Sequence, residues 1–300
     1  MKKNSLNFLI IGLLVIAAFL AGSLWTKIKK EEEKSTSNQP TPVAGVSSFN
    51  PPKSAKPQVK FFVMSFCPYG NQAEAGLEPV YQLLKDKVDW QPHYIVSDKK
   101  TSCERSCPYQ VWNDEAKLSC QVGIDSGRVK SLEECRKQYF PYSSTDECLK
   151  KACVGIKEGE WESLHGAQEL HQDIREICAL KAGSLEEWWK FVSLVNKNCN
   201  SQNADSCWEA QAKEAGLEVE KIKTCEKEEA NDLLKKEAGE VEKYKASGSP
   251  TVFINETLYD GGRAPENYKK AICAAFEKPP KECETVLGSE TQVPASGGCQ

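Results

Sequence analysis

The number of cysteines constrains this chain more than any other feature of its sequence. There are 14 cysteines in 300 residues, and only three histidines accompany them. Intracellular proteins seldom carry so many cysteines unless they bind metal, whereas exported proteins use them in disulfide bonds. The sequence therefore predicts an exported, disulfide-bonded protein with no resident metal and no other cofactor. The close pairs Cys103/Cys107 and Cys148/Cys153 keep a zinc-stabilised segment open as an alternative.

The first 30 residues predict a membrane anchor. An apolar run over residues 8–25 follows Lys2 and Lys3. At 1.5 Å per residue, about 18 helical residues nearly cross a ~30 Å hydrocarbon layer. Phe19 disrupts the small-residue pattern of a cleavage site, so we expect an uncleaved single-pass anchor, with a cleaved signal peptide as the alternative. Lysines flank both ends of the run, but the cysteines favour a body on the extracytoplasmic side, which leaves the first lysines in the cytoplasm.

Composition divides the rest of the chain. Residues 31–57 are rich in Pro and Ser and predict a semi-extended linker. A folded domain is expected over residues 58–277, followed by a flexible tail at 278–300. The net charge is −4, and without a basic patch the sequence gives no reason to expect nucleic acid as a partner.

The ends of the folded domain carry the strand signals. The run VKFFVMSF predicts a buried strand, and Pro68 then suits the first position of a helix, which we expect to be kinked at Pro79. A second strand is predicted at 88–97, which completes a first half at 58–97. The second half, 245–277, predicts strands at 251–254 and 257–259 around an Asn-Glu turn, followed by a helix.

A long insertion, residues 98–244, separates the two halves. Residues 98–160 are rich in cysteine and weakly periodic, so disulfides should hold them. Apolar side chains then recur at helical spacing. Helices are predicted around 170–178 and 185–199, two short ones near 207–215 and 219–225, and a longer one from about 228 to 245. Trp188 and Trp189 are expected in the core.

Cys67 is the candidate nucleophile, because it lies where the first strand meets the helix that begins at Pro68. Unpaired N–H groups and a partial positive charge at a helix N-terminus stabilise a thiolate. Such placement lowers a cysteine pKa from about 8.5 into the ~3.5–7.5 range. The alternative is a structural half-cystine, which is the ordinary role of cysteine in an exported domain.

Two segments around this cysteine resemble a known family. FVMSFCPYG resembles the active-site turn of thioredoxin-fold thiol–disulfide oxidoreductases, and SGSPTVFIN resembles their loop that carries a cis-proline. The resemblance implies an α/β thioredoxin-like fold with a cysteine-rich, mostly helical insertion, and a cis bond before Pro250. It also implies an active-site turn and a substrate-binding loop, which here are Pro68, Tyr69 and Gly70, and Ser249, Pro250 and Thr251.

The insertion narrows the resemblance. Residues 165–178, HGAQELHQDIREIC, are similar to the signature of the gamma-interferon-inducible lysosomal thiol reductase (GILT) family. DsbA-like proteins share the broader plan of a helical insertion in this fold. The motif implies a structural role for His165. We expect structural disulfides to use Cys178, Cys199, Cys207, Cys225, Cys273 and Cys283.

The departures from the family pattern affect the expected mechanism. The family has a second cysteine where this chain has Gly70, cysteines where it has Ser163 and Leu170, and an asparagine where it has Asp173. In the two-cysteine mechanism the second thiolate releases the substrate from the mixed disulfide. Another thiol must do this here, and the candidates are Cys299, Cys103 and Cys107.

The sequence thus predicts a membrane-anchored, extracytoplasmic thiol–disulfide oxidoreductase of the reductase or isomerase type. Its partners would be exported proteins that contain disulfides, together with an external thiol donor or a membrane redox partner. The alternative is a non-catalytic thioredoxin-fold module that binds peptides or proteins, with Cys67 structural or inert.

Overall fold

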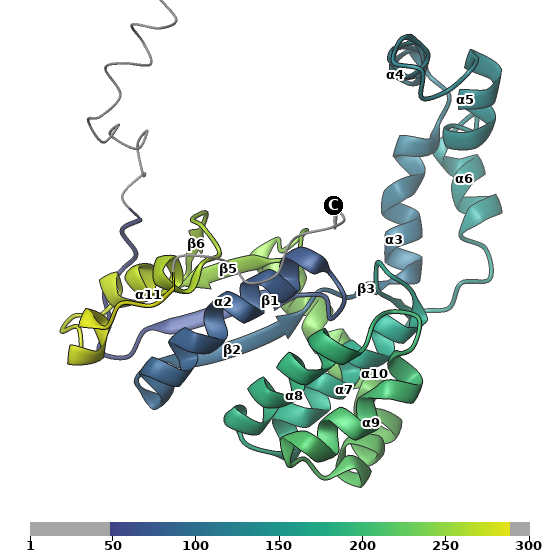
Figure 1. Ribbon diagram of the computed structural model, residues 1–300. Coiled ribbons are helices and arrows are strands. Elements are labelled where there is room, and N and C mark those ends of the chain that lie inside the picture. Colours follow the sequence, from purple (N-terminus) through teal and green to yellow (C-terminus); the bar gives the residue numbers. More distant parts are fainter. Residues whose placement is uncertain (1–48, 289–300) are drawn as a thin grey trace, which may run out of the picture. The chain divides into compact units, whose positions relative to one another are not determined.

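A computed structural model of the chain describes residues 49–288 (Figure 1). The predicted anchor at 8–25, the linker up to residue 48 and Cys299 lie outside these residues. Within 49–288, no helix is both long enough and apolar enough to cross a membrane.

A four-stranded sheet forms the centre of the described chain, in the order β2-β1-β5-β6. Strand β1 (Gln58–Val63) pairs in parallel with β2 (Asp89–Tyr94) and antiparallel with β5 (Thr251–Ile254). Strand β6 (Thr257–Tyr259) closes the hairpin with β5. Two segments nearly 200 residues apart in sequence therefore lie side by side at β1 and β5.

Helices cover both faces of this sheet (Figure 1). Helix α2 (Pro68–Leu84) connects β1 to β2 through the short 3₁₀ turn η1 (Lys85–Lys87), and it packs against α11 (Pro265–Ala274). On the α2 side, Phe61 stacks on Trp189 with 5.6 Å between ring centroids. On the other face, Phe62 lies 5.5 Å from the ring of Tyr244, at the end of α10. Adjacent residues of β1 thus anchor opposite faces, as expected for a central strand.

Four helices of the insertion form one bundle beside the sheet. They are α7 (Ala167–Ala182), α8 (Leu185–Asn198), α9 (Ala204–Ala215) and α10 (Val219–Tyr244). The disulfide Cys178–Cys225 joins α7 to α10, and Cys199–Cys207 joins the end of α8 to α9. Trp188 and Trp189 are fully buried, as predicted.

The remaining part of the insertion, residues 99–153, is named here the helical arm. It consists of α3 (Lys99–Ser106), η2 (Cys107–Gln110), α4 (Asp114–Asp125), α5 (Leu132–Tyr139) and α6 (Thr145–Ala152). Disulfides Cys103–Cys153, Cys107–Cys148 and Cys120–Cys135 hold these short helices together. A two-stranded sheet of β3 (Ser97–Asp98) and β4 (Trp161–Glu162) closes its base.

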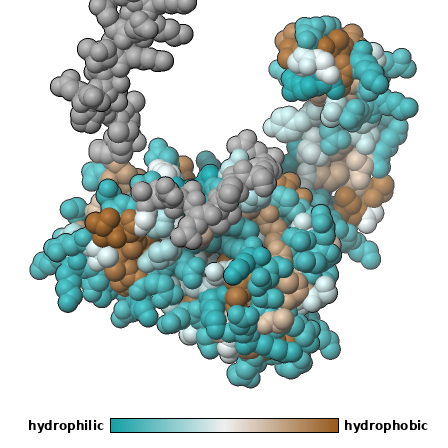
Figure 2. Space-filling view, viewed as in Figure 1, coloured by the Kyte–Doolittle hydropathy of each residue, from teal (hydrophilic) through white to brown (hydrophobic). Residues whose placement is uncertain are grey.

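The arm leaves apolar side chains exposed, as the brown surface over α4 and α5 in Figure 2 shows. Leu118 and Val122 of α4 and Tyr139 of α5 are each about half exposed or more. Disulfides rather than a large core therefore hold this segment, as its weak periodicity indicated.

Two element predictions need correction. The short helix near 219–225 and the longer one from 228 are a single helix, α10, because no glycine or proline interrupts the sequence between them. The second predicted strand ends at Tyr94 rather than continuing to residue 97. Pro79, where the sequence predicts a kink, lies inside α2, which continues to Leu84.

The start of the predicted flexible tail is also ordered. Residues 281–284 form η3 (Lys281–Glu284), and a disulfide joins Cys273 of α11 to Cys283. Glu266 of α11 accepts a hydrogen bond from the Leu287 N–H at 2.8 Å. The chain is therefore attached to α11 up to the end of the described residues.

The turn between β5 and β6 uses Asn255 as a structural residue. Asn255 and Glu256 both adopt positive φ angles, 45° and 63°. The Asn255 carboxamide accepts the Gln58 N–H at 2.8 Å and donates to the Pro52 carbonyl at 2.7 Å. The Asn-Glu turn predicted between the two strands is therefore present, and the Asn255 side chain holds it in place.

Candidate thiol–disulfide site

Cys67 lies at the point predicted from the sequence. It is the N-cap residue of α2, and Pro68 is the first residue of that helix. A tight turn connects it to β1, because the Cys67 N–H donates to the Met64 carbonyl at 3.0 Å. Met64 and Cys67 are buried together, with Tyr69 and Ile95 packed against them.

The loop before β5 meets this turn from the other half of the domain. The Ser249–Pro250 peptide bond is cis, as the resemblance implied. The Ser249 carbonyl oxygen lies 3.5 Å from the Cys67 sulfur, and the Ser249 hydroxyl accepts the Met64 N–H at 3.1 Å. Thr251 donates through its hydroxyl to the Gly248 carbonyl at 2.6 Å, which fixes the loop rather than leaving that hydroxyl for a substrate.

The fold is thioredoxin-like. The strand order, the cysteine at the start of the first helix of the domain, and the cis-proline beside it decide this together.

Cys67 is not a thiolate in this structure. It is disulfide-bonded and has no exposed surface. The other described cysteines form six disulfides among themselves, and no free cysteine occurs in residues 49–288. The six cysteines expected in structural disulfides are paired as Cys178–Cys225, Cys199–Cys207 and Cys273–Cys283.

Two of the three candidate resolving thiols are engaged elsewhere. Cys103 and Cys107 are bonded to Cys153 and Cys148, so neither offers a thiol to Cys67. The zinc alternative depended on the same four cysteines, and in disulfides they offer no thiolate ligands to a metal. Cys299, the third candidate, lies outside the described residues.

Close contacts around position 70 account for the glycine found there. A Cβ atom built at this position would lie 2.5 Å from the Ser249 hydroxyl and 3.3 Å from the Met64 carbonyl oxygen. The Ser249 side chain therefore fills the space that a second cysteine of a C-x-x-C motif would need. The same hydroxyl accepts the Met64 N–H, so the side chain that excludes a second cysteine also forms a hydrogen bond across the site.

Carboxylates of α7 hold the turn before Cys67. Asp173 Oδ1 accepts both the N–H and the hydroxyl of Ser65, at 3.0 and 2.6 Å. Glu169 accepts the Phe66 N–H at 2.9 Å and contacts His165 Nδ1 at 2.7 Å. His165 is therefore part of the support for Glu169, which agrees with the structural role implied by the motif. The insertion thus builds the turn that positions the cysteine.

These carboxylates belong to a buried acidic cluster of Glu74, Glu169, Asp173 and Glu176. Burial raises the pKa of Asp173 well above its ordinary value, and the charge of Glu169 adds to this. Burial, followed by the charge of Glu176, raises the pKa of Glu74. Burial also raises the pKa of Glu176 to about 7. The carboxyl groups of Glu74, Asp173 and Glu176 thus keep their protons to a higher pH than exposed carboxyl groups do.

Sequence reasoning missed part of this cluster. Asp173 and Ser163 stood out only as departures from the family motif, yet Ser163 donates to Glu169 at 2.8 Å and Asp173 holds Ser65. One signal was available: Asp173 and Glu176 share the helical face of the buried Ile177. Acidic residues on the apolar face of a helix indicate buried carboxylates with specific partners.

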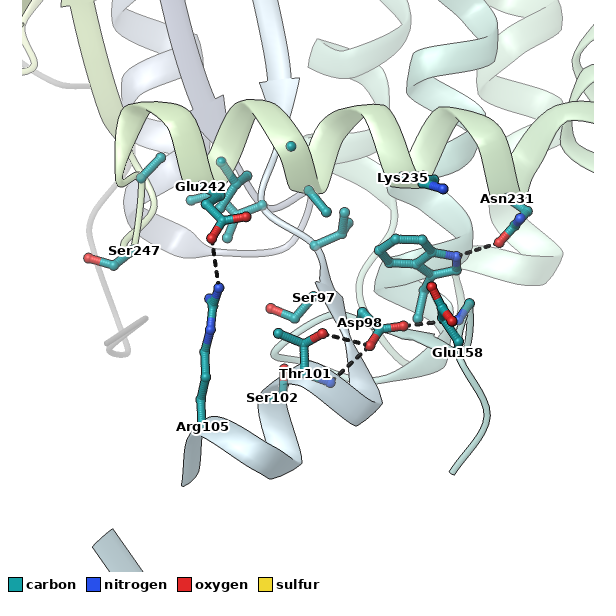
Figure 3. A pocket seen from close by; sticks show the side chains of 18 of the residues that line it. Ser97, Asp98, Thr101, Ser102, Arg105, Glu158, Asn231, Lys235, Glu242 and Ser247 are labelled. Atoms are coloured by element: carbon teal, nitrogen blue, oxygen red, sulfur yellow. Dashed lines mark hydrogen bonds and ion pairs between the residues drawn. The ribbon is translucent and has the colours of Figure 1, made fainter. Parts of the chain in front are cut away.

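A cavity of about 1160 Å³ lies between the base of the helical arm and α10 (Figure 3). Ile95, which packs against the buried pair of Met64 and Cys67, lines this cavity, and so does Ser247, two residues before Ser249. Asp98 in its wall is held by the Thr101 and Gly159 N–H groups, and Arg105 pairs with Glu242 at 3.0 Å. The cavity therefore reaches from the arm to the surroundings of the cysteine.

Comparison with known proteins supports the fold and adds a family likeness. The model of the vacuolar sorting receptor thioredoxin-like domain matches residues 130–273. Vacuolar-sorting receptor 5 of Arabidopsis thaliana is 26% identical over 233 residues, 64% of this chain and 37% of the receptor. Vacuolar-sorting receptor 6 of the same plant is 23% identical over 257 residues, 71% of this chain and 40% of the receptor. The chain thus spans about two-fifths of the length of these relatives, and the matching family is not the GILT family that the motif resembles.

Solved structures with a similar chain path include bacterial disulfide oxidoreductases. The reduced DsbG of Mycobacterium tuberculosis has a TM-score of 0.42 and 14% identity, over 81% of this chain and 94% of that one. A probable DsbA oxidoreductase of Streptomyces coelicolor has a TM-score of 0.42 and 13% identity, over 81% of this chain and 98% of that one.

Proposed function

We propose that the chain is a thiol–disulfide oxidoreductase in which Cys67 exchanges disulfides with exported proteins. The observation that supports this best is the place of the Cys67 disulfide, at the N-cap of α2 and 3.5 Å from the carbonyl before the cis-proline. In the reduced chain, the Cys67 thiolate attacks a substrate disulfide, forms a mixed disulfide and releases one substrate thiolate. The partner thiolate of Cys67 then attacks the Cys67 sulfur, releases the second substrate thiolate and forms the Cys67 disulfide present in this structure. The substrate is thereby reduced, and an external thiol donor reduces the Cys67 disulfide for the next cycle.

We propose Cys299 as this partner. The sequence has 14 cysteines, six disulfides account for twelve of them, and Cys67 is also bonded. Cys299 is the cysteine that remains. It would replace the second cysteine that Gly70 and Ser249 leave no room for.

Trapping tests this proposal. A Cys299→Ser chain, incubated with a disulfide-containing peptide, should hold that peptide on Cys67 as a stable mixed disulfide, because no partner thiol releases it. The tryptic peptide of residues 61–85 carries Cys67 and identifies the adduct by mass. The double variant Cys67→Ser, Cys299→Ser is the control and should trap nothing. A folded Cys299→Ser chain that traps no peptide contradicts the proposal.

The second candidate is a binding module without redox chemistry. Two observations favour it: Cys67 has no exposed surface, and the matching family and curated relatives are named as sorting receptors. Such a module would bind cargo proteins and keep its Cys67 disulfide throughout. Binding of a protein partner that is unchanged in the Cys67→Ser variant would support this candidate.

We also propose that residues 8–25 anchor the protein in a membrane, with the described domain on the extracytoplasmic side. The support is the apolar run and the number of disulfides. A membrane-bound chain that resists alkaline extraction and keeps its first residues agrees with this proposal. A mature chain that begins after residue 22 contradicts it.

A further inference from the structure

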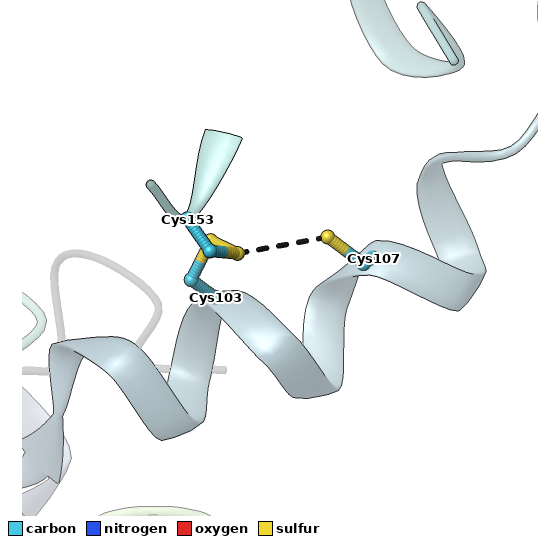
Figure 4. A group of neighbouring side chains, drawn as sticks. All are labelled: Cys103, Cys107 and Cys153. Carbon is cyan, nitrogen blue, oxygen red and sulfur yellow. Dashed lines mark hydrogen bonds between the residues drawn. A yellow bond between two sulfur atoms is a disulfide. The ribbon is translucent and has the colours of Figure 1, made fainter. Parts of the chain in front are cut away.

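Two disulfides of the helical arm lie against each other. Cys103 and Cys107 are one turn apart on α3 and η2, and their partners Cys153 and Cys148 lie at the end of α6 and within it. The Cys107 sulfur lies 3.7 Å from the Cys153 sulfur (Figure 4), so sulfurs of different bonds are in van der Waals contact. The sulfurs of Cys103, Cys107 and Cys153 all lie within 4.8 Å of one another.

The two bonds differ in their access to solvent. Cys107 and Cys148 have no exposed surface, and Cys153 is 8% exposed. Cys103 is the most accessible of the four cysteines. Its neighbour Ser102, together with Arg105, lines the cavity that reaches toward Cys67 (Figure 3). A peptide bound in this cavity would therefore lie within one helical turn of the outer bond, Cys103–Cys153.

The sequence around the other bond of the pair, the inner bond Cys107–Cys148, repeats the sequence around Cys67. Cys107, Pro108 and Tyr109 reproduce the triplet of Cys67, Pro68 and Tyr69, and Cys107 likewise begins a helical turn. Tyr109 is 81% exposed, which leaves an aromatic side chain beside the bond for a partner to contact.

We propose that these four cysteines form a second thiol–disulfide exchange site, which takes a thiol-bearing peptide or protein. The incoming thiolate attacks the Cys103 sulfur, forms a mixed disulfide and releases Cys153 as a thiolate. Cys153 then attacks the Cys107 sulfur, forms Cys107–Cys153 and releases Cys148. If the substrate is a dithiol, its second thiolate attacks its own sulfur in the mixed disulfide and frees Cys103. The substrate leaves oxidised, and the arm keeps one bond and two thiols.

This inference goes beyond the proposed function, since Cys67 takes no part in it. Each of the four cysteines lies on a tryptic peptide of its own: residues 101–105, 106–117, 138–150 and 152–157. Peptide mapping therefore distinguishes every pairing without ambiguity. The disulfide Cys120–Cys135 in the same arm is an internal control, which should remain intact.

Two single variants test the exchange directly in the full chain. Both Cys103→Ser and Cys153→Ser remove the outer bond, but they leave different thiols. Cys103→Ser leaves Cys153 next to Cys107, so the purified chain at pH 8 should contain the Cys107–Cys153 bond and an alkylatable Cys148. Cys153→Ser leaves the more distant Cys103 and should keep Cys107–Cys148. Retention of Cys107–Cys148 in both variants, or equal exchange in both, overturns the proposal.

The unmodified chain gives a second test, which does not depend on how the variants fold. Dithiothreitol is added until two thiols per chain appear in the arm, and the thiols are then alkylated in acid. The expected product links peptides 106–117 and 152–157 and is alkylated at Cys103 and Cys148. A product alkylated at Cys103 and Cys153, with Cys107–Cys148 retained in every molecule, overturns the proposal. So does an arm that stays unreduced until the domain unfolds.

Discussion

At the scale of single residues, Gly70 and Ser249 together decide what chemistry the site supports. A second cysteine near Cys67 would allow the two-cysteine cycle, but the Ser249 hydroxyl lies where its Cβ would stand. The same hydroxyl accepts the Met64 N–H, so it cannot move away without losing a buried hydrogen bond. The exclusion of a second cysteine therefore depends on Gly70 and Ser249 together rather than on position 70 alone.

Gly70→Ala should lower the free energy of unfolding by about 1–3 kcal/mol, because overpacking outweighs the helix preference of alanine. In a Ser249→Ala background, the added cost should fall below about 0.5 kcal/mol, since the clashing oxygen is gone. Urea unfolding of the four chains measures both values. Gly239→Ala in α10 is the control, because an added Cβ there meets no atom within 4 Å and should not destabilise.

At the scale of elements, α7 is the support of the active-site turn. It lies in the insertion, yet its carboxylates accept the N–H groups of Ser65 and Phe66 directly before Cys67. The insertion and the two halves of the domain are therefore one structural unit at this turn. Removing the insertion would leave these buried N–H groups without acceptors, which is costly.

The Asp173 carboxylate offers a matched pair of substitutions. Asp173→Asn keeps an oxygen acceptor for Ser65 and cannot ionise beside Glu169, so we expect stability at pH 8 to be unchanged or higher. Asp173→Ala leaves the Ser65 N–H without its acceptor and should cost about 1–3 kcal/mol. Thermal unfolding of both variants checks this. Equal destabilisation by the two substitutions would show that the carboxylate charge itself is required.

The elements also differ in how well the sequence predicts them. The strands 251–254 and 257–259, the helix start at Pro68 and the core tryptophans follow from local patterns, and the structure has them there. The pairing of β1 with β5 joins segments far apart in sequence, and only the family resemblance suggested it. The Gly70–Ser249 contact and the carboxylates beneath Ser65 depend on three-dimensional placement that no spacing in the sequence encodes.

At the scale of the whole molecule, the buried acidic cluster makes stability depend on pH. The pKa of Glu176 is about 7 in the folded chain and near 4.5 when unfolded, so the folded chain binds more protons between these values. The free energy of unfolding should therefore fall as pH rises from about 5 to 8, by up to roughly 3 kcal/mol for this group. Denaturant unfolding across this range measures the slope.

Glu176→Gln identifies the source of that slope. The substitution keeps an acceptor for Tyr94, which donates to Glu176 at 2.7 Å, and it cannot ionise. The pH dependence should become flatter without vanishing, because burial also raises the pKa values of Glu74 and Asp173. A chain whose stability rises with pH over this range would show that the cluster is not protonated as described.

At this scale, the Cys67 disulfide must exchange while the structural disulfides of the bundle and of α11 hold the fold. The direct measurement is differential alkylation of the native chain at increasing dithiothreitol, followed by tryptic mapping. We expect Cys67 on peptide 61–85 to become alkylated at concentrations that leave Cys178–Cys225 and Cys273–Cys283 intact. Protection of Cys67 until the domain unfolds, together with those two structural bonds, would contradict it.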